Sequence, residues 1–264
     1  MPPIVTLPPT IADRLDVVET VGVFHGAQKY VFVCRRSLGD LIVVKMFKQN
    51  FVERDRREIE FYVKNKQLLG IPKVIGLLEI DNDTIVVEEY IKGNILRKVQ
   101  REYLHNSKKI KNLCRNIFLR MEPIWDKGYV HRDLKPENII IHDDGSPYII
   151  DFGVFKNPER TTITSTDFQP HTKEYAAPEQ LIADKNSISY RTDFFSLGVI
   201  AYELRYGVLP FGNTEEQILH SFRGGQLNCT LTDGCELNEF LLSVLQFNVS
   251  MRPGRLNKVL EALA

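Results

Sequence analysis

The chain has 264 residues, and 34 lysines and arginines balance 34 aspartates and glutamates, so the formal net charge is zero. This balance excludes the global positive field that non-specific nucleic-acid binding normally uses, and four cysteines without C-x-x-C spacing indicate neither a disulfide framework nor a structural zinc site. The start lacks a basic and apolar leader, and no uncharged apolar run approaches the roughly 20 residues of a membrane span, which favours a cytoplasmic protein without a membrane anchor.

The first third of the chain changes from a proline-rich start to a strand pattern. Residues 1–14 are expected to form an N-terminal tail, because four of the first ten residues are proline. From about residue 15, runs of branched and aromatic residues between turn signals are typical of strands. Residues 51–69 instead predict a single helix, because a set of side chains recurs there at helical spacing, namely Phe51, Asp55, Glu58, Tyr62 and Leu69. The strand runs are Tyr30 to Val33, Leu41 to Phe47 and Thr84 to Val87.

From residue 95 onward the apolar residues recur at helical spacing. Residues 110–125 place their apolar side chains on one broad face, and the stretch from Phe194 to Leu204 is apolar nearly all round, which predicts a central helix. We therefore expect an α+β protein with two lobes and a short joint. The expected bounds are about 15–91 for a small β-rich lobe with one helix, 89–94 for the hinge and about 95–264 for a larger, mainly helical lobe.

Three short motifs follow one another in the second lobe. H-R-D-L-K-P-E-N occupies residues 131–138, a hairpin pattern leads to D-F-G at 151–153, and A-P-E stands at 177–179. D-F-G alone is more often a turn than a metal site, but the ordered set has a negligible chance origin. The set resembles the catalytic domain of serine/threonine protein kinases, and with Val43-Val44-Lys45 and later landmarks the resemblance spans about residues 15–264. It implies a bilobal kinase fold that uses ATP and Mg²⁺.

Phosphoryl transfer from ATP gives each motif residue a task. The phosphate charge must be neutralised, Mg²⁺ must be placed, and the attacking hydroxyl must be oriented in line. Asp133 would accept or orient the hydroxyl proton, and Lys135 would offset the charge of the moving phosphate. Asn138 and Asp151 are hard oxygen donors near the ends of the short hairpin, so both are expected to hold Mg²⁺. The resemblance also pairs Glu179 with Arg252 in a buried salt bridge.

The nucleotide site is expected to use residues from both lobes. Lys45 would hold the inner phosphates, and a carboxylate on the 51–69 helix would hold Lys45. Glu58 is preferred to Glu53 and Glu60. It shares a helical face with Asp55, Tyr62 and Leu69, whereas Glu60 points about 200° away at about 100° per residue. The expected ATP-binding residues are Gly26, Val31, Val43, Lys45, Glu58, Glu89, Ile91 and Ile140.

The sequence departs from the pattern of the family in two regions, the phosphate-covering loop and the residue before the hinge. The resemblance places Phe24, Gly26 and Lys29 at the three glycine positions of the phosphate-covering loop, and a side chain there restricts the approach of the backbone to phosphate. Glu88 occupies the position before the hinge, where the family usually carries an apolar residue or threonine. Because burying an unpaired carboxylate is costly, Glu88 should find a basic partner or a proton, unless the register is shifted by one residue.

The substrate side is predicted from two features. Lys135, together with Thr172 three residues before Tyr175, resembles serine/threonine kinases, so the expected acceptor is a protein Ser or Thr hydroxyl. Segment 154–171 is either a solvated threonine-rich loop or carries an activating phosphosite that Arg132 would neutralise. The hydroxyl residues that could carry the phosphate are Thr161, Thr162, Thr164, Ser165 and Thr166.

Two rival functions remain open. The degraded glycine loop also suits a pseudokinase-like module that binds nucleotide and regulates a partner, although the catalytic residues named above are all present. A small-molecule phosphotransferase of kinase-like fold generally lacks A-P-E and the threonine-containing segment. The expected function is therefore direct in-line transfer of the γ-phosphate of ATP to a protein. Regulation is expected through segment 154–171, the N-terminal tail or a separate activating protein partner.

Overall fold

The computed structural model describes residues 6–25, 29–47, 60–61, 64–65, 67–80, 83–152, 173–224, 231 and 234–264. The chain divides into two units, Met1–Lys92 and Gly93–Ala264. The observed α+β composition, a sheet in the first unit and mainly helices in the second, confirms the predicted fold class. No helix among these described segments is long and apolar enough to cross a membrane.

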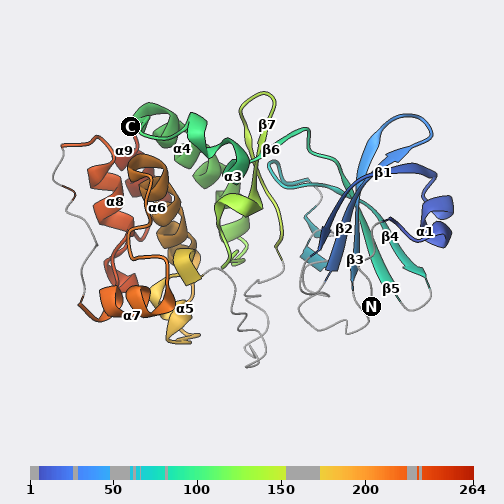
Figure 1. The fold of residues 1–264 in the computed structure, drawn as a ribbon. Helices are drawn as coiled ribbons and strands as arrows, with labels where there is room; N and C mark the ends of the chain where they lie inside the picture. The colour runs from blue at the N-terminus through green and yellow to red at the C-terminus, as the bar shows by residue number, and fades with distance from the viewer. Residues whose placement is uncertain are drawn as a thin grey trace. The chain divides into compact units, whose positions relative to one another are not determined.

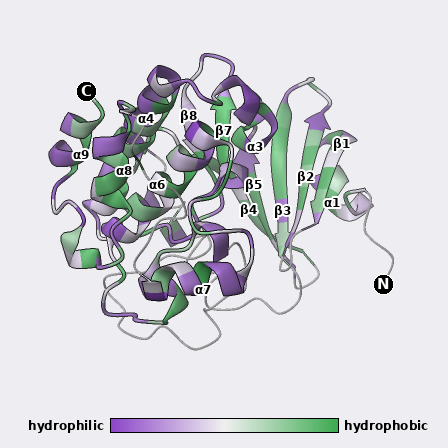
Figure 2. Cartoon of the chain, turned by 60° about the vertical axis from the view of Figure 1, so that its left-hand side comes forward, coloured by the Kyte–Doolittle hydropathy of each residue, from purple (hydrophilic) through white to green (hydrophobic). Residues whose placement is uncertain are grey.

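The first unit contains a five-stranded antiparallel sheet in the order β1-β2-β3-β5-β4 (Figure 1). β2, β3 and β5 contain the three strand runs that the sequence predicts, and Figure 2 shows β3 as mostly hydrophobic. In the pairing of β2 with β3, Val31 lies opposite Lys45, and in the pairing of β3 with β5, Lys45 lies opposite Val86. The strands are β1 Val17–His25, β2 Lys29–Arg36, β3 Leu41–Phe47, β4 Val74–Ile80 and β5 Asp83–Glu89.

The N-terminal residues differ from the predicted tail. Pro9–Arg14 forms helix α1, and Leu7 and Ile11 are buried against one face of the sheet. Proline suits the first turn of a helix, where its missing N–H has no intrahelical partner in any case. The face covered in this way carries Phe32, Cys34, Ile42, Val44, Met46, Ile85 and Val87. The expected 51–69 helix falls mostly outside the described residues, although Glu60, Phe61 and Lys64 are helical.

Helices dominate the second unit. The longest, α4 at Ser107–Trp125, buries the predicted apolar face, and α6 at Tyr190–Tyr206 is buried almost all round, as predicted. Both pack into one aromatic core in which the ring centroids of Phe118 and Phe194 lie 5.0 Å apart. The other helices are α3 Leu96–Val99, α5 Pro178–Leu181, α7 Glu215–Gly224, α8 Asn238–Val244 and α9 Leu256–Ala262.

A small three-stranded sheet, β6-β7-β8, stands at the start of this unit. Gly93 in β6 (Gly93–Ile95) passes so close to β7 (Ile139–His142) that a Cβ there would lie 2.1 Å from the Ile141 carbonyl oxygen. Only glycine therefore permits this approach. β7 and β8 (Pro147–Ile149) form the hairpin that carries the predicted metal residues at its open end.

Candidate active site

The backbone before Asp133 is anchored by one buried carboxylate on α6. Asp193 accepts hydrogen bonds from the backbone N–H of His131 and of Arg132, each at 2.9 Å, and from Trp125 Nε1 at 2.8 Å. Burial raises the pKa of Asp193, and the hydrogen bonds offset only part of that effect. The H-R-D segment is thus fixed to the central helix of the unit.

Arg132 adopts a backbone conformation that is uncommon for a side chain other than glycine. Its φ is +70°, within the left-handed region, which costs energy that the surroundings must supply. The Arg132 N–H donates to Asp193, and Gln180 Nε2 donates to the Arg132 carbonyl oxygen at 2.7 Å, so the backbone is held on both sides of this residue. The strained turn fixes the direction in which the chain presents the next residue, Asp133.

The carboxylate of Asp133 contacts the side chains of two residues that follow it in the chain. Lys135 Nζ lies 2.8 Å from Asp133 Oδ2, and Asn138 Nδ2 lies 3.2 Å from the same oxygen. Asn138 Nδ2 also donates to the Asp133 carbonyl oxygen at 2.8 Å. The carboxylate is therefore held in one orientation beside a cation, as a group that positions a hydroxyl near a phosphate requires.

The β7–β8 hairpin brings Asn138 and Asp151 to the same end. Ile139 is opposite Ile149, and the Ile150 N–H donates to the Asn138 carbonyl oxygen at 3.0 Å. His131 Nε2 donates to the Ile150 carbonyl oxygen at 3.1 Å, which ties the hairpin end to the H-R-D segment.

The donor set at this end suits Mg²⁺. The Nδ2 of Asn138 donates to Asp133, which leaves the Oδ1 of Asn138 as the atom that could bind a metal, and the Asp151 carboxylate at the same hairpin end offers further oxygens. Within the described ranges no three His, Cys, Asp or Glu side chains gather to form a metal cage. Two protein oxygen ligands fit Mg²⁺, which usually completes its shell with phosphate oxygens and water.

In the first unit, Val31, Val43 and Lys45 share the face of the sheet opposite α1. Val31 lies directly opposite Lys45, and Val43 is two residues from Lys45 on the same strand, so the alternation of side chains places all three together. Both valines are half-buried, which leaves an apolar surface beside the buried Lys45.

Glu88 finds the basic partner that the sequence analysis expects. Its Oε1 lies 2.7 Å from Lys45 Nζ, and both side chains are almost fully buried. In the β3–β5 register Val43 is opposite Glu88, so the two charged residues are diagonal neighbours on one face. Of the hinge residues, Glu89 accepts a 3.0 Å bond from the Lys73 N–H, and Ile91 is buried.

The other predicted residues divide into described and undescribed positions. Ile140 lies on β7, half-buried and paired with Tyr148. The placement of the remaining predicted residues is not described, namely Gly26, Glu58, Thr161, Thr162, Thr164, Ser165, Thr166 and Thr172.

A buried ion pair holds the A-P-E motif itself, whose Glu179 lies on α5. Arg252 Nη1 and Nη2 bind the two carboxylate oxygens of Glu179 at 2.7 and 2.8 Å, which confirms the expected salt bridge. Thr192 Oγ1 donates to Glu179 Oε1 at 2.8 Å, and Arg252 lies over the ring of Phe195. The bidentate pair ties α5 to the loop before α9, and the Thr192 bond ties α5 to α6.

A cluster of ion pairs and hydrogen bonds around Arg97 on α3 is not predicted by the sequence. Arg97 binds Glu137 at 2.7 Å and Glu203 at 2.6 Å, and it also donates to the hydroxyl of Tyr175. Burial would lower the pKa of Arg97, but the bonds to these three groups raise it above its ordinary value. The cluster joins the catalytic segment, α6 and the stretch before A-P-E. Its partners are 40 to 106 residues from Arg97 in sequence, so no local pattern indicates it.

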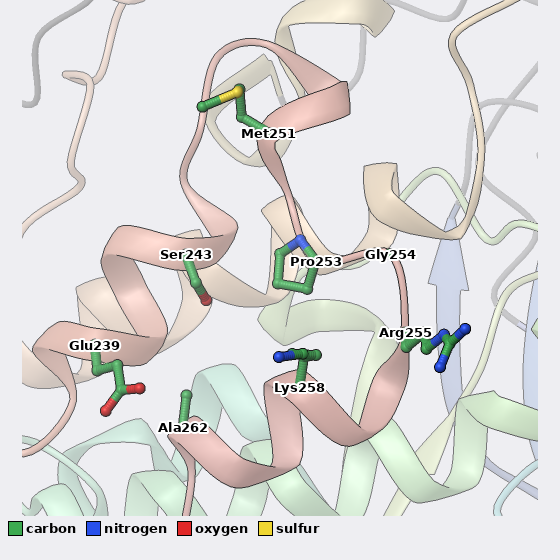
Figure 3. Close-up of a pocket in the computed structure, with 8 residues that line it drawn as sticks. All are labelled: Glu239, Ser243, Met251, Pro253, Gly254, Arg255, Lys258 and Ala262. Carbon is green, nitrogen blue, oxygen red and sulfur yellow. The ribbon is translucent and has the colours of Figure 1, made fainter.

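A surface pocket of about 520 Å³ lies elsewhere in the second unit (Figure 3). Its walls come from α8, from the loop around Met251 and from α9, as the labels on Glu239 and Lys258 show. None of its lining residues belongs to the H-R-D segment or to the hairpin, so we do not assign it to the catalytic site.

Comparison with known proteins agrees with this geometry. Residues 16–262 match the family model described as the protein kinase domain. The chain is 28% identical over 208 residues to a probable serine/threonine-protein kinase of Clostridium perfringens, covering 76% of this chain and 30% of that protein. It is 29% identical over 218 residues to a serine/threonine-protein kinase of Myxococcus xanthus, covering 76% and 39%. It is 26% identical over 263 residues to citron rho-interacting kinase of Rattus norvegicus, covering 95% and 13%.

The chain thus spans well under half the length of these relatives. The family match nevertheless covers nearly all of the chain and includes every motif residue of the site. The chain therefore belongs to the protein kinase domain family.

Proposed function

We propose that this chain is an ATP-dependent serine/threonine protein kinase, active in the cytoplasm, whose catalytic domain spans residues 15–264. The observation that carries the proposal is the contact of Lys135 Nζ and Asn138 Nδ2 with one carboxylate oxygen of Asp133. A carboxylate oriented next to a lysine has the chemistry that phosphoryl transfer to a hydroxyl needs. The names of the relatives above support the same reaction type.

In the proposed mechanism, Asp133 orients the acceptor hydroxyl and takes its proton while the hydroxyl oxygen bonds to the γ-phosphorus in line. The bond from the γ-phosphorus to the bridging oxygen breaks, and ADP leaves. Lys135 offsets the negative charge on the moving phosphate. Asn138 Oδ1 and Asp151 would hold Mg²⁺, which neutralises charge on the phosphate oxygens when it is bound. No covalent enzyme intermediate is needed, because the hydroxyl attacks the phosphate directly.

ATP is the proposed phosphate donor. We assign Lys45 to the inner phosphates, with Glu58 as its helical partner and Gly26 in the covering loop. The half-buried Val31, Val43 and Ile140 suit the faces of the purine ring, because each offers an apolar surface. The hinge residues Glu89 and Ile91 complete the proposed nucleotide site.

The acceptor is proposed to be a protein Ser or Thr hydroxyl, with Thr172 in the substrate-binding segment. We propose that one hydroxyl among Thr161, Thr162, Thr164, Ser165 and Thr166 is an activating phosphosite. A separate protein partner is a second proposed route of regulation.

The type of acceptor can be tested by mapping the product. Purified protein is incubated with ATP and a general acceptor such as myelin basic protein, once with Mg²⁺ and once with excess EDTA. Tandem mass spectrometry should find phosphoserine or phosphothreonine only in the Mg²⁺ sample. Phosphotyrosine alone, or release of free phosphate with no modified protein, would contradict the proposal.

A further inference from the structure

The pair formed by Lys45 and Glu88 differs from the other ion pairs of the sheet. Its atoms are 2.7 Å apart, and the two side chains are 6% and 3% exposed. The pair between Arg35 and Glu19 on neighbouring strands has a similar length, 2.9 Å, but its side chains are 41% and 56% exposed. A surface pair of that kind contributes little, whereas a buried charge depends on its partner.

The geometry of the sheet fixes where the Glu88 carboxylate lies. Glu88 is on β5, which pairs with β3 on one side and β4 on the other, so its backbone is held from both sides. Lys45 is opposite Val86, two residues from Glu88, and such diagonal neighbours on one face are within reach of long side chains. The carboxylate therefore reaches Lys45 from the rigid sheet and not from a separate helix.

We infer that Glu88 is a positioning residue for Lys45: it holds the ammonium group in place on the sheet face that also carries Val31 and Val43. This inference rests on the proposed function, in which Lys45 binds the phosphates of ATP. The carboxylate from the 51–69 helix keeps its proposed role, and Glu88 adds a second carboxylate. The residue before the hinge thereby sets the direction from which the lysine approaches the nucleotide.

The kinetic test uses Glu88→Gln, which keeps the size of the side chain and removes its charge. We expect kcat with ATP to fall about tenfold or more, because a small displacement of a positioning group strongly slows transfer, while KM for the protein substrate stays within about twofold. Glu88→Asp keeps the charge on a shorter arm and should lose less activity. Glu19→Gln removes a carboxylate from the exposed pair and should match wild type.

A second readout does not depend on activity. Trace acylation of native protein, followed by peptide mapping, measures how fast Lys45 reacts relative to the exposed Lys258. An adjacent carboxylate favours the charged, unreactive ammonium form, so Lys45 should react several-fold faster in Glu88→Gln than in wild type. If Glu88→Gln does not fold, Glu88→Asp, in which the contact is lengthened, should show an increase of the same sign.

These outcomes separate the inference from the proposed function. Unchanged kcat and unchanged Lys45 labelling in folded variants, or a faster enzyme after Glu88→Gln, would overturn the inference while kinase activity stands. A purely structural pair would lower the melting temperature and leave kcat per folded molecule unchanged, which would also overturn it. If wild type transfers no phosphate, the proposed function fails, and the labelling result still decides whether Glu88 holds Lys45.

Discussion

At the scale of single residues, the surroundings of three cysteines give their thiols different pKa values. The thiols of Cys34 and Cys114 are buried, and burial raises their pKa values to about 11 and about 12. Cys235 is only half-buried. Burial alone would raise its pKa, but hydrogen bonds from Ser107 and the Leu237 backbone, together with Arg205, lower it below the ordinary value. The Nε of Arg205 lies 3.0 Å from its sulfur.

These environments predict an order of alkylation. Because the thiolate is the reactive form, iodoacetamide at about pH 8 should label Cys235 well before Cys34 or Cys114 in the folded protein. Peptide mapping at several times measures the order, and Cys235→Ser serves as the control that removes the fast site. Equal labelling of the three residues before unfolding would show that these environments are wrong.

At the same scale, the sequence indicates candidates for the catalytic residues more readily than it predicts the contacts between side chains. Asp133, Lys135, Asn138 and Asp151 are recognisable because their motif spacing is local. For Glu88 the sequence predicts either a basic partner or a proton, since the register of β3 and β5 decides which lysine is near. Arg97 is not predicted at all, because its contacts join distant segments.

At the scale of the elements, the distance between α6 and α8 depends on a glycine at their contact. A Cβ added to Gly198 in α6 would lie 2.6 Å from Val244 Cγ2 and 2.9 Å from Leu245 Cδ2. α6 and the end of α8 are therefore packed at a distance that only glycine allows. The nearly continuous apolar sequence of α6 predicts a buried helix but does not show which neighbour needs this glycine.

Gly198→Ala should therefore destabilise the fold even though alanine is the better helix former. Overpacking of this kind costs about 1–3 kcal/mol, which urea unfolding followed by fluorescence or circular dichroism can resolve. Gly224→Ala, at the end of α7, is the matched control, because no neighbouring side chain in the described part of the chain lies within 4 Å of the added Cβ. That control should be neutral or slightly stabilising. Equal effects of the two changes would contradict the close α6–α8 packing.

The sequence predicts the long helices α4 and α6 but not the short helix α1. α4 and α6 extend over 19 and 17 residues, and their burial follows the sequence pattern. α1 has only 6 residues and begins at a proline, so it is hidden in a proline-rich stretch that resembles a tail. Its burial depends on the sheet that it covers, which is not visible from the local sequence.

At the scale of the whole molecule, binding of nucleotide and metal should raise the melting temperature of the protein. A ligand that binds only the folded state at about 100 times its Kd stabilises that state by about 2.7 kcal/mol. We therefore expect ATP with Mg²⁺ to raise Tm more than ATP with EDTA. Asp151→Asn should lose most of the Mg²⁺-dependent part and keep the part due to nucleotide alone. A full Mg²⁺ effect in this variant would mean that Asp151 does not hold the metal.

The most direct test of the central claim compares phosphate transfer by wild type and by Asp133→Asn. The asparagine keeps the size of the side chain and one oxygen that can accept from Lys135 and Asn138, as Asp133 Oδ2 does, so the fold and the shift in Tm caused by ATP should persist. Intact-mass spectrometry of an added protein substrate measures transfer, which should fall about a hundredfold or more because the group that accepts the proton is lost. Transfer at the wild-type rate by a folded Asp133→Asn protein would contradict the assignment of this site.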